Sequence, residues 1–261
     1  MIGIRTAIAG SLGGGKSWDA DLVTYITGLE TPLSSGQLTL LNNFILALKS
    51  GLSITNLLDA FDCMYILAGE TAESSLRNLV KRSHDATAVN SPTFTALEGF
   101  RGDGISSYID TNYNPYSQKV NSNLDDCAYG VYIRTNTTSY GSTKYYLTSL
   151  NIANQRIIAL SYNSQNYRIN STNYTTAAFV TPNFIGASRN EAASFNVFDA
   201  TYYNNAEGAS TTVPNANIHL IYNTDSQQSF YFQGKSISES QKNIIVNAFE
   251  AYMDANGKGV I

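Results

Sequence analysis

The segment CAYGVYIRT, residues 127–135, places Tyr129, Val131 and Ile133 two residues apart. Successive side chains of a strand point to opposite faces, so this spacing predicts a β-strand with an apolar face. Similar short runs, rich in Tyr, Phe, Ile, Val and Thr, recur from about residue 88 onward and are separated by Asn, Ser and Gly clusters. Repeated short strands at this spacing predict an antiparallel sandwich or jelly roll.

Two helical regions flank the strands. Residues 19–87 are predicted to be mainly helical, and Ser34 with Gln37 forms a capping box ahead of a helix that Gly51 should end. Its apolar stripe consists of Leu38, Leu41, Ile45 and Leu48. A last helix begins at a second capping box, Ser238 with Gln241, and its apolar face holds Ile245, Ala248, Phe249 and Tyr252.

Three parts follow from this pattern. Residues 1–18 are predicted to be a flexible, glycine-rich arm, residues 19–87 a helical segment packed on the sandwich, and residues 88–261 the β-sandwich with its C-terminal helix. The fold class is therefore mainly β, with helices at both ends of the strand region.

The composition limits the function. Only 14% of the residues are charged and the net charge is -4, so the basic face of a general nucleic-acid binder is missing. The i, i+4 spacing within the cluster of Arg77, Lys81, Arg82 and His84 predicts a solvated helix face. No signal peptide is visible, and no apolar run approaches the length of a membrane span, so membrane insertion is not expected.

The segment from Gly10 to Ser17, GSLGGGKS, fits the pattern of a nucleotide-binding P-loop. A working P-loop also needs a second strand that delivers an acidic residue to the metal ion, and no later segment has that form. We interpret the segment instead as a hinge behind a docking arm. Ile2, Ile4 and Ile8 give the arm an apolar edge that can add to a sheet of a partner subunit.

Other motifs have plain interpretations. Cys63 and Cys127 match no metal spacing and are expected to be reduced and buried, although a disulfide between them is not excluded. Arg101-Gly102-Asp103 spells an integrin tripeptide but is predicted to form a tight turn. Neither a metal nor a cofactor is expected.

The arrangement resembles virion structural proteins of bacteriophages, especially those infecting Bacteroidetes, which carry a helical segment before a concanavalin A-like, LamG-like jelly roll. The stretches that carry the resemblance are LTLLNNFILALKSGLSITNLLDAFDCMYILAGET, GFRGDGISSYIDTNYNP and SISESQKNIIVNAFEAYMDANG. The resemblance covers residues 25–256 and implies a concanavalin A-like sandwich and a virion location, after synthesis in the host bacterial cytoplasm. It implies no fixed ligand.

The sequence lacks the paired catalytic carboxylates that a glycoside hydrolase needs. Glycoside hydrolases on such sandwiches commonly use Glu-x-Asp-x-x-Glu, which is absent, and the carboxylates of Glu98, Asp110, Glu191 and Glu207 are scattered. Sugar rings stack on aromatic side chains, so exposed loop tyrosines are candidate glycan contacts. The candidates are Tyr113, Tyr116, Tyr140, Tyr162, Tyr167 and Tyr203.

The sequence therefore predicts a non-enzymatic virion protein: a capsid decoration, head-fibre or tail-associated subunit that presents a lectin-like sandwich to host-surface glycans. It is expected to dock on other virion proteins through its arm and to form a symmetric homo-oligomer. The alternatives are a free carbohydrate-binding module and a glycoside hydrolase on the same fold.

Overall fold

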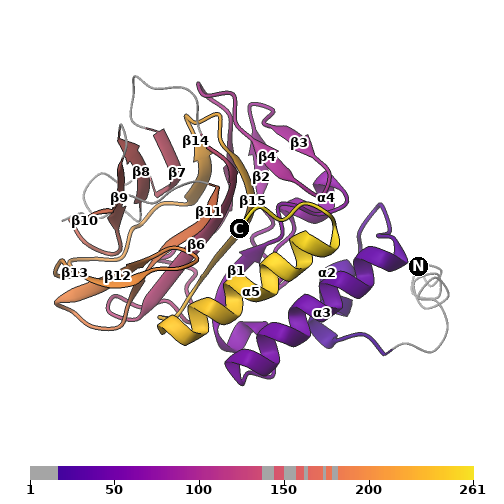
Figure 1. Ribbon diagram of the computed structural model, residues 1–261, viewed down its shortest axis with the longest axis horizontal. Coiled ribbons are helices and arrows are strands. Elements are labelled where there is room, and N and C mark those ends of the chain that lie inside the picture. Colours follow the sequence, from indigo (N-terminus) through magenta and orange to yellow (C-terminus); the bar gives the residue numbers. More distant parts are fainter. Residues whose placement is uncertain (1–16, 137–143, 150–156, 162–163, 173–174, 178–181) are drawn as a thin grey trace.

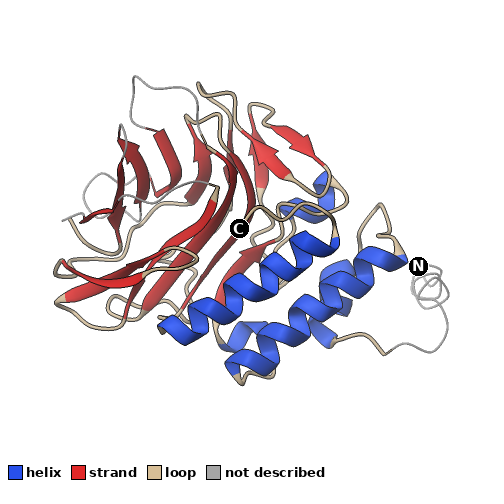
Figure 2. Cartoon of the chain, in the orientation of Figure 1, coloured by secondary structure: helices blue, strands red, loops and turns tan. Residues whose placement is uncertain are grey.

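The protein is described by a computed structural model for residues 17–136, 144–149, 157–161, 164–172, 175–177 and 182–261. Figures 1 and 2 show a layered molecule in which two sheets face each other and the long helices lie together on one side. The docking residues Ile2, Ile4 and Ile8 lie outside the described residues, so the arm stays a prediction.

The first sheet, called sheet A, has eight strands within the described residues, in the order β13-β12-β11-β6-β15-β4-β3, with β1 also paired to β15. All of its pairings are antiparallel. The strands are β1 Phe61–Tyr65, β3 Thr93–Thr95, β4 Gly99–Arg101, β6 Cys127–Thr135, β11 Asn183–Arg189, β12 Ser194–Phe198, β13 Tyr203–Glu207 and β15 Gln227–Gly234.

The second sheet, sheet B, is also antiparallel and has seven described strands in the order β10-β9-β8-β7-β14-β5-β2. They are β2 Thr87–Val89, β5 Tyr108–Asp110, β7 Lys144–Ser149, β8 Ile157–Ser161, β9 Ser164–Arg168, β10 Thr175–Ala177 and β14 Ile218–Tyr222. The predicted antiparallel sandwich is therefore confirmed. The domain boundary at residues 87 and 88 stays a prediction, and β1, from the N-terminal side of it, belongs to sheet A.

The helices are α2 Ala20–Ile26, α3 Ser35–Leu52, the 3-10 turn η1 Leu57–Asp59, α4 Ala72–Leu76 and α5 Glu239–Ala255. The capping box of Ser238 and Gln241 is confirmed. At α3, Ser34 accepts a hydrogen bond from the Gln37 N–H, but the Gln37 side chain bonds to Tyr252 and Asn256 near the end of α5. That capping box is therefore only half formed.

Gly51 does not end α3, as the sequence predicted. The helix continues to Leu52 and ends at Ser53, whose φ of 55° is left-handed. A Cβ on Gly51 would stand only 2.5 Å from the Cγ2 atom of Ile244 in α5, which is closer than two carbon atoms can pack. Glycine is thus required for the close approach of α3 and α5 rather than for the helix stop.

Two apolar cores explain the layers. One lies between the sheets and includes Tyr129, Val131 and Ile133 of β6, as the alternation predicted. The other lies between sheet A and the helices and takes the intervening residues Ala128 and Tyr132. Strand β6 is consequently buried on both faces along most of its length, because α5 covers the side that faces away from sheet B.

The basic cluster at residues 77–84 is not the solvated helix face that its spacing predicted. Helix α4 ends at Leu76, and Arg77 is buried. Its guanidinium donates to the carbonyl oxygens of Tyr25, Thr27 and Gly28, each at 3.0 Å. Arg77 directly follows α4, so these bonds connect the end of α2 to the end of α4.

The expectation that no apolar run reaches the length of a membrane span is wrong at one place. Among the described residues, the helical segment Ser35–Asp59 has the length and hydropathy of such a span. Its apolar side chains Leu41, Phe44, Ile45 and Leu48 are buried in the core against sheet A and α5. Packing inside the protein accounts for these four side chains, and the absence of membrane insertion stays a prediction.

Candidate ligand-binding site

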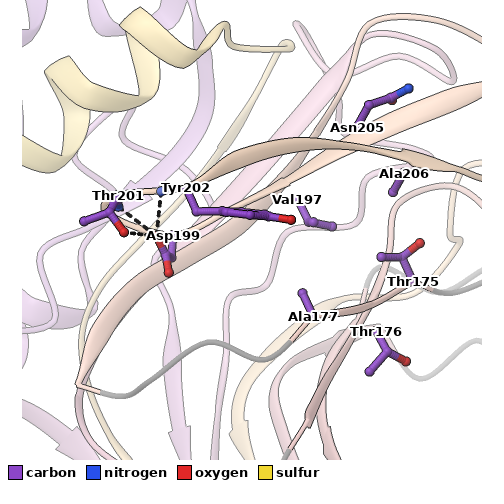
Figure 3. Close-up of a pocket in the computed structure, with 9 residues that line it drawn as sticks. All are labelled: Thr175, Thr176, Ala177, Val197, Asp199, Thr201, Tyr202, Asn205 and Ala206. Atoms are coloured by element: carbon purple, nitrogen blue, oxygen red, sulfur yellow. Dashed lines mark hydrogen bonds between the residues drawn. The ribbon is translucent and has the colours of Figure 1, made fainter.

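A pocket opens at one end of the sandwich, between the edge strand β10 of sheet B and the β12–β13 hairpin of sheet A. Its volume is about 550 Å³. The described lining residues, drawn in Figure 3, are Thr175, Thr176, Ala177, Val197, Asp199, Thr201, Tyr202, Asn205 and Ala206. Strands β10 and β13 are the edge strands of their sheets, and side chains of both sheets line this space.

The turn between β12 and β13 is held by Asp199. One of its carboxylate oxygens accepts hydrogen bonds from the Thr201 N–H, at 2.7 Å, and from the Tyr202 N–H, at 2.7 Å. Asn183 of β11 donates its side-chain amide to the other oxygen at 3.2 Å. This arrangement fixes the direction in which Tyr202 leaves the backbone, and Figure 3 shows its ring running from the turn toward Val197.

The pocket has the chemistry of a site for polyhydroxylated ligands. The Tyr202 side chain is 39% exposed and offers an aromatic face. Thr175, Thr176 and Asn205 add hydroxyl and amide groups, which can donate and accept hydrogen bonds. Among the described lining residues, Asp199 supplies the charge and none is Lys, Arg or His.

The tyrosines predicted from sequence are placed differently. Tyr113 and Tyr167 are fully buried, so a ligand has no access to their rings. The Tyr113 hydroxyl donates to the buried carboxylate of Asp62 at 2.7 Å. Tyr113 is thus a structural residue, and Tyr167 belongs to the core between the sheets.

The remaining candidates lie apart from one another. The Tyr203 ring stacks on Phe198 and its hydroxyl donates to the Ile237 carbonyl, so it faces the helical side of sheet A. Tyr116 is 56% exposed, with Lys119 Nζ 5.9 Å from its ring centroid, and stays a candidate. Tyr140 and Tyr162 lie outside the described residues.

The sequence reasoning chose Tyr203 and missed its neighbour Tyr202. A local signal was available, because Asp199-Ala-Thr-Tyr202 has the form of an Asp-initiated turn, in which the carboxylate accepts from backbone N–H groups two and three residues on. Such a turn directs Tyr202 out of the strand while Tyr203 begins β13. Thr175 and Asn205 carried no comparable signal.

The carboxylates whose pKa is shifted do not have the character of a general acid. Within the described residues, the acidic groups with a shifted pKa are Asp59, Asp62, Glu98, Asp103 and Asp110, and every shift is downward. For Glu98 the leading cause is the hydrogen bond from Lys258. A glycosidase acid instead needs a raised pKa so that it holds a proton at neutral pH.

One row of side chains resembles a hydrolase triad in composition. Asp110, His219 and Thr148 are directly paired across β5, β14 and β7, and His219 Nε2 lies 3.7 Å from Asp110 Oδ2. Thr148 is only 1% exposed, however, so its hydroxyl cannot meet a substrate in this conformation. The row presents no accessible nucleophile.

The cysteines and the Arg-Gly-Asp motif have structural roles. Cys63 and Cys127 are buried and not joined to each other. Asp103 accepts hydrogen bonds from the N–H groups of Ile105, Ser106 and Ser107, each at 2.9 Å, which confirms the predicted turn. Because this carboxylate is occupied within its own loop, it is not presented as a free acidic group.

No protein-family model matches the chain, and no curated protein matches it. Solved structures of similar fold include a point mutant of HCR/D, with a TM-score of 0.54, 9% identity and coverage of 72% of this chain and 52% of that one. Another is the binding domain of botulinum neurotoxin DC in complex with SialylT, with a TM-score of 0.52, 12% identity and coverage of 74% and 52%.

This chain thus spans about half the length of those solved chains. At such low identity the likeness shows the fold alone. The fold is a mainly β, antiparallel, concanavalin A-like sandwich with helices at its N-terminal and C-terminal sides, as the sequence predicted. The similar structures are toxin domains and say nothing of phage particles, so the resemblance to virion proteins stays a prediction.

Proposed function

We propose that this protein is a non-enzymatic, lectin-like binding protein and that its edge pocket holds a glycan. The observation that carries the proposal is the Tyr202 ring, which the Asp199 turn directs into a space lined with hydroxyl and amide side chains. A pyranose ring has an apolar face that stacks on an aromatic side chain and a rim of hydroxyls that hydrogen-bond. The pocket offers partners for both.

The charge of the pocket favours a neutral sugar. Asp199 contributes a carboxylate, and the described lining residues contribute no cation. An acidic sugar would lose hydration without gaining an ion pair. One solved chain of similar fold, of which this chain covers 52%, was determined in complex with SialylT, whereas the charges of the pocket here favour a neutral glycan.

The proposal that the protein is not an enzyme is supported by the state of its carboxylate and hydroxyl side chains. The described carboxylates with shifted pKa values stay ionised, and Thr148 of the Asp110-His219-Thr148 row is buried. Both observations argue against a glycoside hydrolase on this fold. A free carbohydrate-binding module is the remaining alternative, because it would use the same pocket.

We further propose that the sandwich serves as a virion subunit that contacts host-surface glycans, as a homo-oligomer made in the host bacterial cytoplasm. This step rests on the sequence resemblance. Mass spectrometry of purified particles tests it, since a virion subunit is present in a fixed copy number and a free module is absent.

Binding at the pocket is tested on a glycan array, followed by titration calorimetry with the best neutral glycan. Tyr202→Ala should weaken binding about tenfold, because ring stacking is lost. Tyr116→Ala is the matched control, since it removes another exposed tyrosine on a different loop. Loss of binding in Tyr116→Ala with none in Tyr202→Ala would contradict the pocket assignment.

A further inference from the structure

The outer face of sheet B carries a row of aromatic side chains on three neighbouring strands. Tyr145 of β7, Tyr222 of β14 and Tyr108 of β5 follow one another, with ring centroids 6.1 Å and 5.4 Å apart. His219 of β14 lies beside Tyr108, at 4.6 Å between ring centroids. These four side chains are called the aromatic row.

Two irregularities in the strands create this row. Along β14, His219 faces outward and Leu220 inward, so regular alternation would turn Ile221 outward and Tyr222 inward. Ile221 has a φ of 51° and is buried in the core between the sheets. The extra inward residue leaves Tyr222 on the outer face, directly paired with Tyr145.

Strand β7 has a similar irregularity, with two successive side chains pointing inward. Its register with β8 shifts between Tyr145 and Leu147, and both Tyr146 and Leu147 belong to the inner core. Tyr145 is thereby placed outward, opposite Tyr222. Bulges commonly redirect a side chain next to a binding site, and a left-handed conformation is a genuine outlier for a β-branched residue such as Ile221.

The core does not account for the aromatic row. Tyr108, Tyr145 and Tyr222 are half-buried and belong to neither apolar core. The long helices lie against sheet A, on the far side of the molecule from this face (Figure 1). The strained backbone therefore places aromatic surface where none of the described helices covers it.

Polar groups border the row at β5. Asp110 accepts hydrogen bonds from the Asn112 N–H at 2.8 Å and from the Asn217 amide at 3.1 Å. Burial alone would raise the pKa of Asp110, but hydrogen bonds from His219, Asn112 and Asn217 hold it below its usual value. Next to His219, the Thr148 hydroxyl and the His219 Nδ1 atom are buried without a hydrogen-bond partner in the described structure.

We propose that the aromatic row is a second ligand-binding surface, which takes a linear neutral glycan laid across β5, β14 and β7. Adjacent strands lie about 4.8 Å apart, so ring-bearing residues on neighbouring strands can serve successive sugar units. The charged Asp110 at one end accepts hydrogen bonds from hydroxyls and repels anionic ligands. Strands β8 and β9 separate this surface from the edge pocket at β10, so the inference does not depend on that pocket.

The test uses the full chain and a panel of linear neutral hexasaccharides: cellohexaose, laminarihexaose, maltohexaose, mannohexaose and chitohexaose. Saturation-transfer NMR and calorimetry give the affinities. We expect at least one hexasaccharide to bind about tenfold or more tightly than its monosaccharide, because several rings engage the chain. Tyr222→Ala should weaken that binding about tenfold, while Tyr222→Phe, which keeps the ring, should retain most of it.

The edge-pocket variant Tyr202→Ala separates the two sites, because the share of hexasaccharide binding that depends on Tyr222 should persist in it. If Tyr222→Ala fails to fold, as judged by circular dichroism, Tyr145→Ala and Tyr108→Ala replace it. No saturable binding of any hexasaccharide would overturn the proposal, as would binding that survives Tyr222→Ala and is lost in Tyr202→Ala. The latter result would leave the edge pocket as the glycan site.

Discussion

The ammonium group of Lys242 on α5 donates a hydrogen bond to the carbonyl oxygen of Ala200 at 2.9 Å, although Lys242 is only 1% exposed. Ala200 belongs to the turn that carries Tyr202. Burial lowers the pKa of Lys242, because removing the charged ammonium group from water costs free energy. Through this hydrogen bond, the C-terminal helix α5 holds the turn between β12 and β13 that lines the edge pocket.

We expect Lys242→Met to loosen that turn without unfolding the protein, because methionine retains the packing of the stem but has no donor. Backbone amide exchange at Thr201 and Tyr202 should accelerate about tenfold, corresponding to the loss of one charge-assisted hydrogen bond. Glycan affinity should fall less than in Tyr202→Ala. The exposed Lys119→Met is the control, and unchanged exchange in Lys242→Met would show that the turn is held without α5.

A second buried charge organises the loop at residues 114–122. Asp62 accepts hydrogen bonds from the N–H groups of Val120, Asn121 and Ser122 and from the Tyr113 hydroxyl. Burial would raise the pKa of Asp62, but the hydrogen bonds from Asn121, Tyr113 and Ser122 outweigh it, and the pKa lies below its usual value. The carboxylate thus stabilises the folded state in its ionised form.

This predicts a pH-dependent effect of Asp62→Asn. At pH 7 the substitution should lower the free energy of unfolding by about 3 kcal/mol, since an amide cannot accept all four hydrogen bonds. The contribution of Asp62 is present above the unfolded pKa, near 4, and is lost as the pH falls through the lower folded pKa. The difference from wild type in urea titrations should therefore shrink in acid. A difference that stays constant to pH 3 would contradict this account, and the exposed Asp254→Asn should change stability little at any pH.

We expect that replacing Arg189 even with lysine will destabilise the protein. Its buried guanidinium donates to the carbonyl oxygens of Ile169, Glu191, Ala192, Ser194 and Gly208. Lysine keeps the charge but cannot reach carbonyls in several directions at once. Arg189→Lys should cost about 3 kcal/mol and lower the melting temperature by roughly 10 °C. The exposed Arg82→Lys is the matched control, and equal melting temperatures for the two variants would refute a special role for Arg189.

The features that the sequence predicted correctly are local ones. The capping box of Ser238 and Gln241 spans three residues, and the alternation of Tyr129, Val131 and Ile133 follows from strand geometry alone. The capping box predicted at Gln37 is only half formed because its side chain bonds to Tyr252 and Asn256, more than 200 positions away at the end of α5. The helix stop predicted at Gly51 was wrong for the same reason, since glycine is needed there because of the close approach of Ile244.

The sites were harder to predict than the fold. Tyr202 and Tyr203 are adjacent and alike in sequence, and only the Asp199 turn separates their roles. In β14, regular alternation assigns Tyr222 to the interior, and the left-handed backbone at Ile221 reverses that assignment. Such a bulge is stabilised by packing across two sheets, which no short window of sequence contains.

The last prediction concerns the N-terminal arm. Asp19 caps α2, its carboxylate lies 2.6 Å from Lys49 Nζ, and its N–H donates to Asn42. Trp18 packs against the helical core. These contacts make Trp18 and Asp19 part of the folded domain, and the residues before them are the arm that the sequence predicts. Deleting residues 1–16 should therefore change the melting temperature by no more than about 2 °C, and glycan binding should be retained.

Deleting residues 1–19 is the informative comparison, because it also removes Trp18 and the Asp19 cap. Loss of an N-cap and a partly buried ion pair should cost about 1–2 kcal/mol and lower the melting temperature by several degrees. If Ile2, Ile4 and Ile8 form a docking edge, the shorter deletion should fold normally yet fail to join the particle when expressed in infected cells. Normal incorporation of that variant would exclude the arm as the anchor, and a melting temperature as low as that of the longer deletion would instead make residues 1–16 part of the folded domain.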